Sequence, residues 1–291
     1  MHFKTLVGTV TLALNLICFH SNALAADAPR IISLAPHMTE MIYDLGLEEQ
    51  LVARDDASNY PEEAKSLPSI GTGFNPNKEL LLLYQPDLLL HFTSKTQFTE
   101  IFPSNNIDVI ASMPNSVEAL FDDWHMILAR VQTDPTKRTA TEEKIDATEA
   151  EWQSLVKDYK NQELKKVFFL ISDYPLFSLS DMSFLSQAIK SCRTENIFAD
   201  MKQVSFIASP EEILLRNPEV VIHGYSTTEP NDKERSQEAA IKLFEKVGLE
   251  LSTEQLVTVD ADILYRPTLR FIKALPQICE AIHHTKATAA D

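Results

Sequence analysis

Three histidines are the side chains of this sequence best placed for metal chemistry. His37, His91 and His223 each follow a short apolar run that predicts a buried strand. In open α/β sheets, ligands bind at the carboxyl ends of the strands, where such residues lie. An imidazole there could be an axial ligand of haem iron, of a metal chelate or of a corrinoid cobalt. The alternative is that each imidazole only forms hydrogen bonds with its own loop.

Aromatic and charged side chains at other predicted strand ends suit a large, flat, partly apolar ligand. The aromatic set comprises Tyr60, Phe92, Tyr174, Phe177, Phe206 and Tyr225. These rings could line a cleft, or they could pack inside a lobe. Arg266 stands directly before a proline and could pair with Asp262, or bind a carboxylate, amide or phosphate of the ligand.

The sequence lacks the motifs that catalysis would require. It contains no Gly-x-Ser-x-Gly, no His-Glu-x-x-His and no cysteine cluster. The adjacent pairs Asp55–Asp56 and Asp122–Asp123 are more typical of loop and helix surfaces than of acid–base partners. We therefore expect no enzyme and no cofactor or metal of its own. A secreted hydrolase is the remote alternative. A hydrolase would turn over its substrate, whereas a binding protein would be saturated by a stoichiometric amount of ligand.

One pattern occurs twice in the chain, 132 residues apart. Glu79 precedes Pro86 by the same spacing as Glu211 precedes Pro218, and each proline opens an apolar run that ends in histidine. The pattern predicts a short helix followed by a buried strand, and its repetition predicts two similar lobes with a ligand cleft between them. His91 and His223 could then face each other across that cleft. Glu79 and Glu211 are either charges favoured by the helix dipole or docking residues, and the duplication favours docking.

The rest of the chain predicts the elements that position these residues. Strands alternate with helices in both halves, which indicates two doubly wound α/β lobes with mostly parallel sheets. The stretch from Ser172 to Asp181 is expected to be a loop. Asp134–Pro135 opens a charged stretch of about 25 residues that predicts one long helix. We expect lobes at 26–133 and 163–291 with this helix, 134–162, joining them; an ordinary surface helix is the alternative.

Composition narrows the class of partner. The chain has 291 residues, is 44% hydrophobic and 23% charged, and so predicts a folded protein. Its formal net charge of −16 argues against nucleic acid and anionic membrane as partners. The acidity serves solubility or docking onto a basic partner. With only 6 glycines, the sequence has no Gly-rich phosphate loop.

Residues 1–25 are typical of an export leader. Lys4, an apolar stretch and Ala23–Leu24–Ala25 form the three parts of such a signal, so we expect cleavage near Ala25 and a periplasmic protein. Cys18 raises a lipoprotein alternative, but Ile17 stands where that signal needs a small residue. No later apolar run is long enough to span a bilayer. Export leaves Cys192 and Cys279, which predict one disulfide, with a metal pair or free thiols as alternatives.

The chain resembles a known family, the periplasmic binding proteins of ABC importers for vitamin B12, iron-siderophores and haem. This is the class with a rigid helical backbone. The resemblance covers nearly all of the chain after the leader. It rests on Arg30-Ile-Ile-Ser-Leu-Ala-Pro-His-Met-Thr-Glu40 with Leu45-Gly46, Tyr60-Pro61, Glu79 with Pro86-Asp87-Leu88, Asn196-Ile197-Phe198, and Glu211 with Pro218. The cobalamin-binding branch is the most similar, through Tyr60-Pro61, the two cysteines, Glu195 to Phe198, and Ala261-Asp262 with Arg266.

The resemblance implies a substrate-binding protein that captures a corrinoid and delivers it to a membrane permease. It implies that Tyr60, Asp262 and Arg266 contact the corrinoid, and that Glu79 and Glu211 pair with arginines of the permease dimer. Where that branch presents tryptophans to the ring, this chain offers Phe74, Phe92 and Phe206. Haem or a ferric siderophore is the alternative ligand. We expect a monomer.

Overall fold

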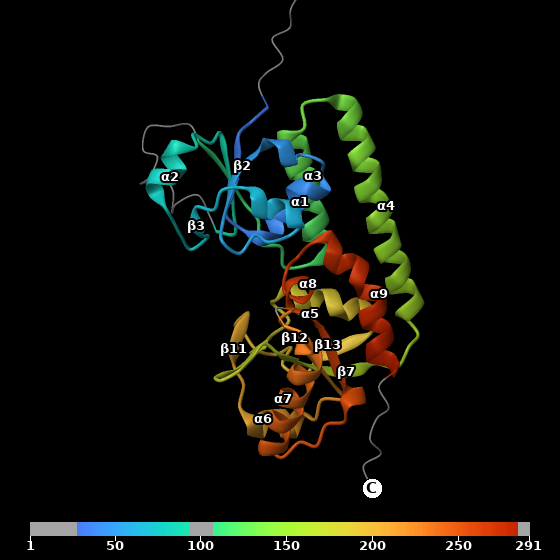
Figure 1. Ribbon diagram of the computed structural model, residues 1–291. Helices are drawn as coiled ribbons and strands as arrows, with labels where there is room; N and C mark the ends of the chain where they lie inside the picture. The colour runs from blue at the N-terminus through green and yellow to red at the C-terminus, as the bar shows by residue number, and fades with distance from the viewer. Residues whose placement is uncertain (1–27, 94–106, 228, 285–291) are drawn as a thin grey trace, which may run out of the picture.

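The computed structural model describes residues 28–93, 107–227 and 229–284. The expected leader, with Cys18 and the cleavage site near Ala25, lies outside the described residues. Two α/β lobes stand one above the other, and one long helix runs beside both (Figure 1). The predicted fold class is confirmed. In the part of the chain that the structure describes, no helix combines the length and the apolar character needed to cross a bilayer.

The N-terminal lobe is built on a four-stranded parallel sheet with the order β2-β1-β5-β6. Its strands are short and largely buried, and their apolar side chains contact helices on both faces. The elements are β1 (Ile31–Ser33), α1 (Pro36–Asp44), η1 (Glu48–Gln50), β2 (Leu51–Arg54), η2 (Glu62–Ser66), β3 (Gly71–Thr72), β4 (Asn75–Pro76), α2 (Lys78–Leu83), β5 (Leu88–His91), β6 (Asp108–Ala111) and α3 (Val117–Val131).

The C-terminal lobe repeats the parallel sheet, with the order β10-β7-β12-β13. It adds a small antiparallel sheet with the order β11-β9-β8. The prediction of a loop from Ser172 to Asp181 is therefore wrong, because this stretch contains the antiparallel strands β8 and β9. The elements are β7 (Lys165–Leu170), β8 (Ser172–Asp173), β9 (Leu176–Leu179), α5 (Phe184–Ile189), η4 (Lys190–Cys192), β10 (Thr194–Asn196), β11 (Ser205–Ile207), α6 (Pro210–Arg216), β12 (Val220–Tyr225), α7 (Asp232–Lys246), η5 (Thr253–Gln255), β13 (Leu256–Asp260), α8 (Ala261–Leu264) and α9 (Leu269–His284).

The sequence repeat has a matching backbone repeat. α2 leads into β5, and α6 leads into β12, each at the centre of its sheet. A side chain caps the start of each helix, Asn77 for α2 and Ser209 for α6. Each helix is followed by a residue with positive φ directly before the proline, Gln85 at 44° and Asn217 at 47°. The same local signals therefore produce the same helix–turn–strand unit in both lobes.

The long helix α4 (Pro135–Tyr159) has 25 residues and links the two lobes. It begins where Asp134 accepts hydrogen bonds from the backbone N–H groups of Thr136 and Lys137. Its first half packs on α3, and its second half contacts η4 and α9. Trp152 fixes the lower contact by donating a 2.9 Å hydrogen bond to the Ser191 hydroxyl.

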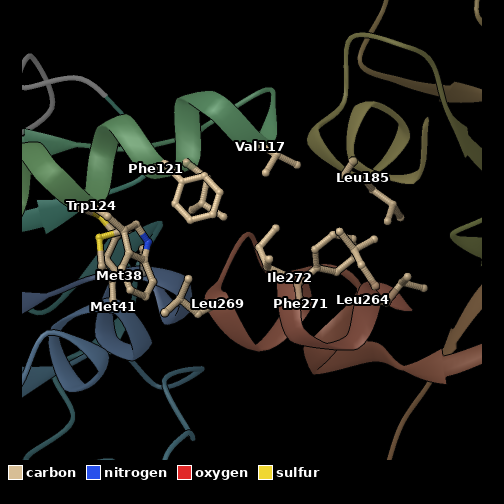
Figure 2. Packing of buried hydrophobic residues seen from close by; sticks show 14 of the residues in the cluster. Met38, Met41, Val117, Phe121, Trp124, Leu185, Leu264, Leu269, Phe271 and Ile272 are labelled. Atoms are coloured by element: carbon tan, nitrogen blue, oxygen red, sulfur yellow. The ribbon is translucent and has the colours of Figure 1, made fainter. Parts of the chain in front are cut away.

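The lobes also share one continuous hydrophobic core. The largest buried cluster contains residues of α1, α3 and both central sheets together with most of the buried face of α9. Figure 2 shows members of this cluster from helices of both lobes, among them Met41 of α1, Phe121 of α3 and Leu269 of α9. α9 belongs to the C-terminal lobe, yet its first turn packs on the N-terminal one. This packing opposes large hinge motions between the lobes.

Within the C-terminal lobe, a disulfide joins Cys192 to Cys279 and fastens α9 to η4. Both cysteines are fully buried, and their Cα atoms are 4.8 Å apart. The bond therefore attaches the helix that carries the inter-lobe packing to the body of its own lobe.

Candidate functional site

A cleft separates the lobes at the carboxyl ends of their parallel strands. It consists of two adjoining cavities of about 480 and 490 Å³, which share Met113, Tyr265 and Pro267 as lining residues. The first cavity is lined mainly by the N-terminal lobe and the second mainly by the C-terminal lobe. Both linings are mostly apolar, so the cleft suits a large ligand with an extended apolar surface.

Two phenylalanines form the apolar wall of the N-terminal lobe. Phe92 directly follows β5 and lines the cavity, and the ring of Phe74 meets its edge with centroids 4.6 Å apart. Phe74 is 79% exposed, so most of its ring is open to a ligand. Gly73 makes this wall possible, because a Cβ there would overlap the Leu34 carbonyl oxygen and lie 3.0 Å from the Phe92 ring. Phe92 thus lines the cleft, and its contact with a ligand stays a prediction.

The facing wall comes from the C-terminal lobe and includes Met182, Val204 and Tyr265. The hydroxyl of Tyr265 accepts a 2.9 Å hydrogen bond from the Gly224 N–H and donates one of 3.3 Å to the Leu170 carbonyl. A Cβ on Gly224 would lie 2.6 Å from the tyrosine ring, so glycine is required beside it. The Tyr265 ring is thereby held in place at the junction of the two cavities.

Phe206, predicted to contact the ligand, lies instead in the core of the C-terminal lobe. It is 5% exposed and packs edge-on against Phe198 with ring centroids 5.1 Å apart. Side chains alternate along β11, which turns Phe206 inward while its neighbour Ile207 stays exposed. Val204, just before the strand, is the residue that reaches the cleft.

Of the three histidines, His37 lines the cleft. Its Nε2 donates a 2.9 Å hydrogen bond to the Ser112 carbonyl, which leaves Nδ1 as the unprotonated ring nitrogen. Burial lowers the pKa of His37 to about 4, and the charge of Arg266 also lowers it. The imidazole is therefore neutral at pH 7.

His91 and His223 do not face each other across the cleft, contrary to the prediction. His91 is fully buried: its Nε2 donates to the Gly73 carbonyl at 2.8 Å, and its Nδ1 accepts from the Thr93 N–H at 2.9 Å. His223 lies 2.9 Å from the Thr258 hydroxyl and lines a separate cavity of about 240 Å³ beside α7. Burial lowers its pKa to about 4. The side chains at these two strand ends turn toward their own loops and helices.

Arg266, predicted as a ligand contact, bridges the two lobes. Its guanidinium donates to Asp262 Oδ1 at 2.7 Å, to Asn59 Oδ1 at 2.8 Å and to Glu40 Oε1 at 3.0 Å. Asp262, the second predicted contact, also accepts a 2.8 Å hydrogen bond from the Asn59 amide. Arg266 and Asp262 belong to the C-terminal lobe, whereas Asn59 and Glu40 belong to the N-terminal lobe. Arg266 and Asp262 therefore close one end of the cleft through hydrogen bonds that join the two lobes.

Three residues of this network, Glu40, Asn59 and Arg270, carried no sequence prediction as site residues. Arg270 donates to both carboxylate oxygens of Glu40, at 2.6 and 3.1 Å, and its guanidinium lies 3.9 Å from the centroid of the Tyr60 ring. Burial raises the pKa of the Glu40 carboxyl, and the guanidiniums of Arg266 and Arg270 oppose that rise. The one local signal is Glu40 itself, a charged residue between the apolar positions Met38 and Met41 of α1. We name Glu40, Asn59, Tyr60, Asp262, Arg266 and Arg270 the inter-lobe network.

Glu79 and Glu211 lie away from the cleft, one on each lobe. Each is the second residue of its short helix, and each is exposed to solvent. The Ser209 hydroxyl donates a hydrogen bond to the Glu211 carboxylate and lowers its pKa. The two carboxylates are therefore available to a partner and are not ligands of the cleft.

The described residues offer no metal centre built by the protein itself. No group of three or more histidine, cysteine, aspartate or glutamate side chains that could hold a metal ion occurs within residues 28–93, 107–227 and 229–284.

Comparison with known proteins identifies a consistent set of relatives. A family profile described as "Periplasmic binding protein" matches residues 31–275. The vitamin B12-binding protein of Pectobacterium atrosepticum is 30% identical over 273 residues, which cover 91% of this chain and 92% of that protein.

Solved structures show the same architecture. The periplasmic vitamin B12 binding protein of Vibrio cholerae matches with a TM-score of 0.69 and 25% identity, covering 88% of this chain and 96% of that one. A periplasmic haem binding protein of Vibrio cholerae matches with a TM-score of 0.71 at 19% identity, covering 88% and 99%. The latter similarity shows the fold alone.

Proposed function

This chain belongs to the periplasmic binding protein family, and we propose that it is the substrate-binding component of an ABC importer for a corrinoid. The observation that carries this proposal is the pair of facing apolar walls. Phe74 and Phe92 form one wall, and Met182, Val204 and Tyr265 form the other. A flat macrocycle presents two apolar faces to such walls. The relatives named vitamin B12-binding proteins support the same ligand.

The rim of the cleft supplies polar partners for the amide groups that surround a corrin ring. Asp56 and Asn115 are exposed lining residues that can accept or donate hydrogen bonds. Tyr60 is 43% exposed, and the Asp262 side chain is 39% exposed. Both thus retain surface for a ligand while they belong to the inter-lobe network. We assign to Arg266 the role of holding the rim closed, while its neighbours Tyr60 and Asp262 contact the ligand.

Haem or a ferric siderophore is the second candidate, and His37 favours it. Its unprotonated Nδ1 belongs to the only one of the three predicted histidines that lines the cleft. A neutral imidazole is the form that ligates iron. His91 would first have to release its hydrogen bonds, among them those with Gly73 and Thr93.

The importer role includes export to the periplasm, release of the expected leader, and delivery of the ligand to a permease. We infer that the protein acts as a monomer, since one chain supplies both walls of the cleft. We infer further that Glu79 and Glu211 meet basic side chains of the permease, because they are exposed at equivalent places of the two lobes. The shared core and the inter-lobe network imply a small closure on ligand binding.

Titration calorimetry with cyanocobalamin, haemin and a ferric siderophore tests the ligand. We expect saturable heat with cyanocobalamin at one ligand per chain, with micromolar or tighter affinity, and no consumption of the ligand on prolonged incubation. Heat with haemin alone, lost in His37→Ala, would instead establish the haem candidate. Turnover of any of the three compounds would show a catalyst in place of a carrier.

A further inference from the structure

A further cavity lies inside the C-terminal lobe, next to the cleft. It has a volume of about 240 Å³ and is bordered by the carboxyl ends of β7 and β12 and by one side of α7. Leu170 and Ile171 line it at the end of β7, and His223 and Gly224 line it on β12. Ile171 also lines the cleft, so the two spaces are neighbours. We name this space the β7–β12 cavity.

The topology of the C-terminal sheet favours ligand binding at this place. β7 and β12 are neighbours in the order β10-β7-β12-β13, and the chain leaves them in opposite directions. β7 leads through α5 to β10 on one side, and β12 leads through α7 to β13 on the other. In open α/β sheets, ligands bind in the crevice where connections diverge in this way. The cleft already occupies the corresponding crevice of the N-terminal lobe, between β1 and β5, where Ala35, His37 and Phe92 line it.

The lining of the β7–β12 cavity combines hydrogen-bonding groups with one negative charge. His223 is 3% exposed, and burial lowers its pKa to about 4, so the imidazole is neutral at pH 7. Its Nε2 lies 2.9 Å from the Thr258 hydroxyl, whereas its Nδ1 lies 3.4 Å from the Ser236 hydroxyl. The second distance is long for a hydrogen bond, so the Ser236 hydroxyl is available to a ligand. Asp173 supplies the charge, and in the part of the chain that the structure describes no lysine or arginine lines the cavity.

We propose that the β7–β12 cavity is a second binding site, for a small organic ammonium ion with a short apolar chain. The Asp173 carboxylate pairs with the ammonium group, and the Ser236 hydroxyl accepts one of its hydrogen bonds. The apolar chain packs on Leu170, Ala240 and Leu243, which line the same cavity. The carboxylate and the net charge of −16 both disfavour an anion. A neutral molecule of the same shape would lack the ion pair and bind more weakly.

Ligand-observed NMR with three probes of similar size tests the site: n-butylammonium, n-butanol and butyrate. At pH 7 we expect saturable binding of n-butylammonium with a Kd of about 1 mM or tighter. Binding of n-butanol should be about fivefold weaker, and butyrate should not bind. Asp173→Asn should abolish the preference for the ammonium ion over the alcohol. Asp122→Asn is the matched control, because Asp122 is an exposed aspartate of α3 outside the cavity, and it should keep that preference.

Cyanocobalamin shows whether the cavity is separate from the cleft. For a second site, a saturating concentration of n-butylammonium leaves the affinity for cyanocobalamin unchanged. Displacement of n-butylammonium by cyanocobalamin would show that the cavity is part of the cleft, and the second site would be overturned. Equal binding of n-butylammonium to the unmodified protein and to Asp173→Asn would overturn it too, because the cation would then bind only to the acidic surface in general.

Discussion

Glu40 and Arg270 join the two lobes through a two-pronged ion pair between residues 230 positions apart in sequence. The Glu40 side chain is only 1% exposed, and that of Arg270 is 19% exposed. Arg270 also covers the ring of Tyr60, so one side chain fixes a carboxylate and an aromatic ring of the opposite lobe. The pair lies beside the shared hydrophobic core, and together they set how the lobes face each other.

Removing one partner of this pair should destabilise the protein strongly. Arg270→Met leaves the Glu40 carboxylate buried with Arg266 alone, and we expect a loss of about 3 kcal/mol in the free energy of unfolding. Urea unfolding measures it. Glu40→Met with Arg270→Met removes both charges and should cost at least about 1 kcal/mol less than the sum of the single variants. Simple additivity would show that the two side chains are not coupled.

Acidification should destabilise the protein through His37 and His223. Burial lowers both pKa values to about 4 from the ordinary 6.5, so the unfolded chain binds protons first as the pH falls. The stability due to each neutral histidine is complete above pH 6.5 and is lost between pH 6.5 and 4. We expect a loss of about 2–3 kcal/mol per histidine at pH 4.5, since one pKa unit corresponds to about 1.4 kcal/mol.

The measurement is urea unfolding at pH 7 and pH 4.5. His223→Gln serves as the test variant, because His223 lies outside the cleft and its replacement leaves ligand contacts in place. This variant should lose less stability on acidification than the unmodified protein. An equal loss in both proteins would exclude His223 as a source of the pH dependence.

Phe74→Ala and Phe206→Ala should have opposite consequences. Phe74 is 79% exposed at the cleft, so its removal should change stability by less than about 0.5 kcal/mol. It should weaken cyanocobalamin binding about tenfold, which corresponds to one aromatic contact. Phe206 is 5% exposed in the core, and its removal should cost about 3–5 kcal/mol of stability with little effect on affinity. Calorimetry and thermal unfolding on both variants separate a wall residue from a core residue.

Glu79→Ala and Glu211→Ala should slow docking without altering ligand affinity. Separated, equivalent contacts act nearly independently, so the double variant should show about the sum of the single effects on the association free energy. The slowing should shrink at high salt, where screening weakens long-range attraction. Transport into permease-containing vesicles is the measurement. Unchanged transport by the double variant would leave the glutamates with only a helix-dipole role.

Loss of the disulfide should destabilise the protein by about 4.6 kcal/mol. Cys192 and Cys279 close a loop of 87 residues, and the loop-entropy relation gives that magnitude. Unfolding of the Cys192→Ser, Cys279→Ser double variant checks the value. Thiol titration of unfolded, unreduced protein should detect no free thiol at either position, and two free thiols would contradict the pairing.

Local patterns determined much of the architecture from the sequence alone. Apolar runs, prolines and helix caps are local signals, so they predicted the repeated helix–turn–strand unit and the long helix after Asp134. The same apolar runs placed Phe92 at the end of a predicted strand. A residue directly after a central parallel strand lies at the cleft. The strand ends, and hence the place of the cleft, followed from these signals.

Only the tertiary structure decided which way the strand-end side chains turn and how the lobes meet. His91 and His223 are equivalent in sequence, but each imidazole takes partners that its own loop or helix happens to place nearby. Phe206 is buried because the hairpin of β8 and β9 pairs with β11, a contact that a local pattern does not specify. The inter-lobe network joins residues more than 200 positions apart. Such contacts depend on the packing of two complete lobes, so no spacing within either half encodes them.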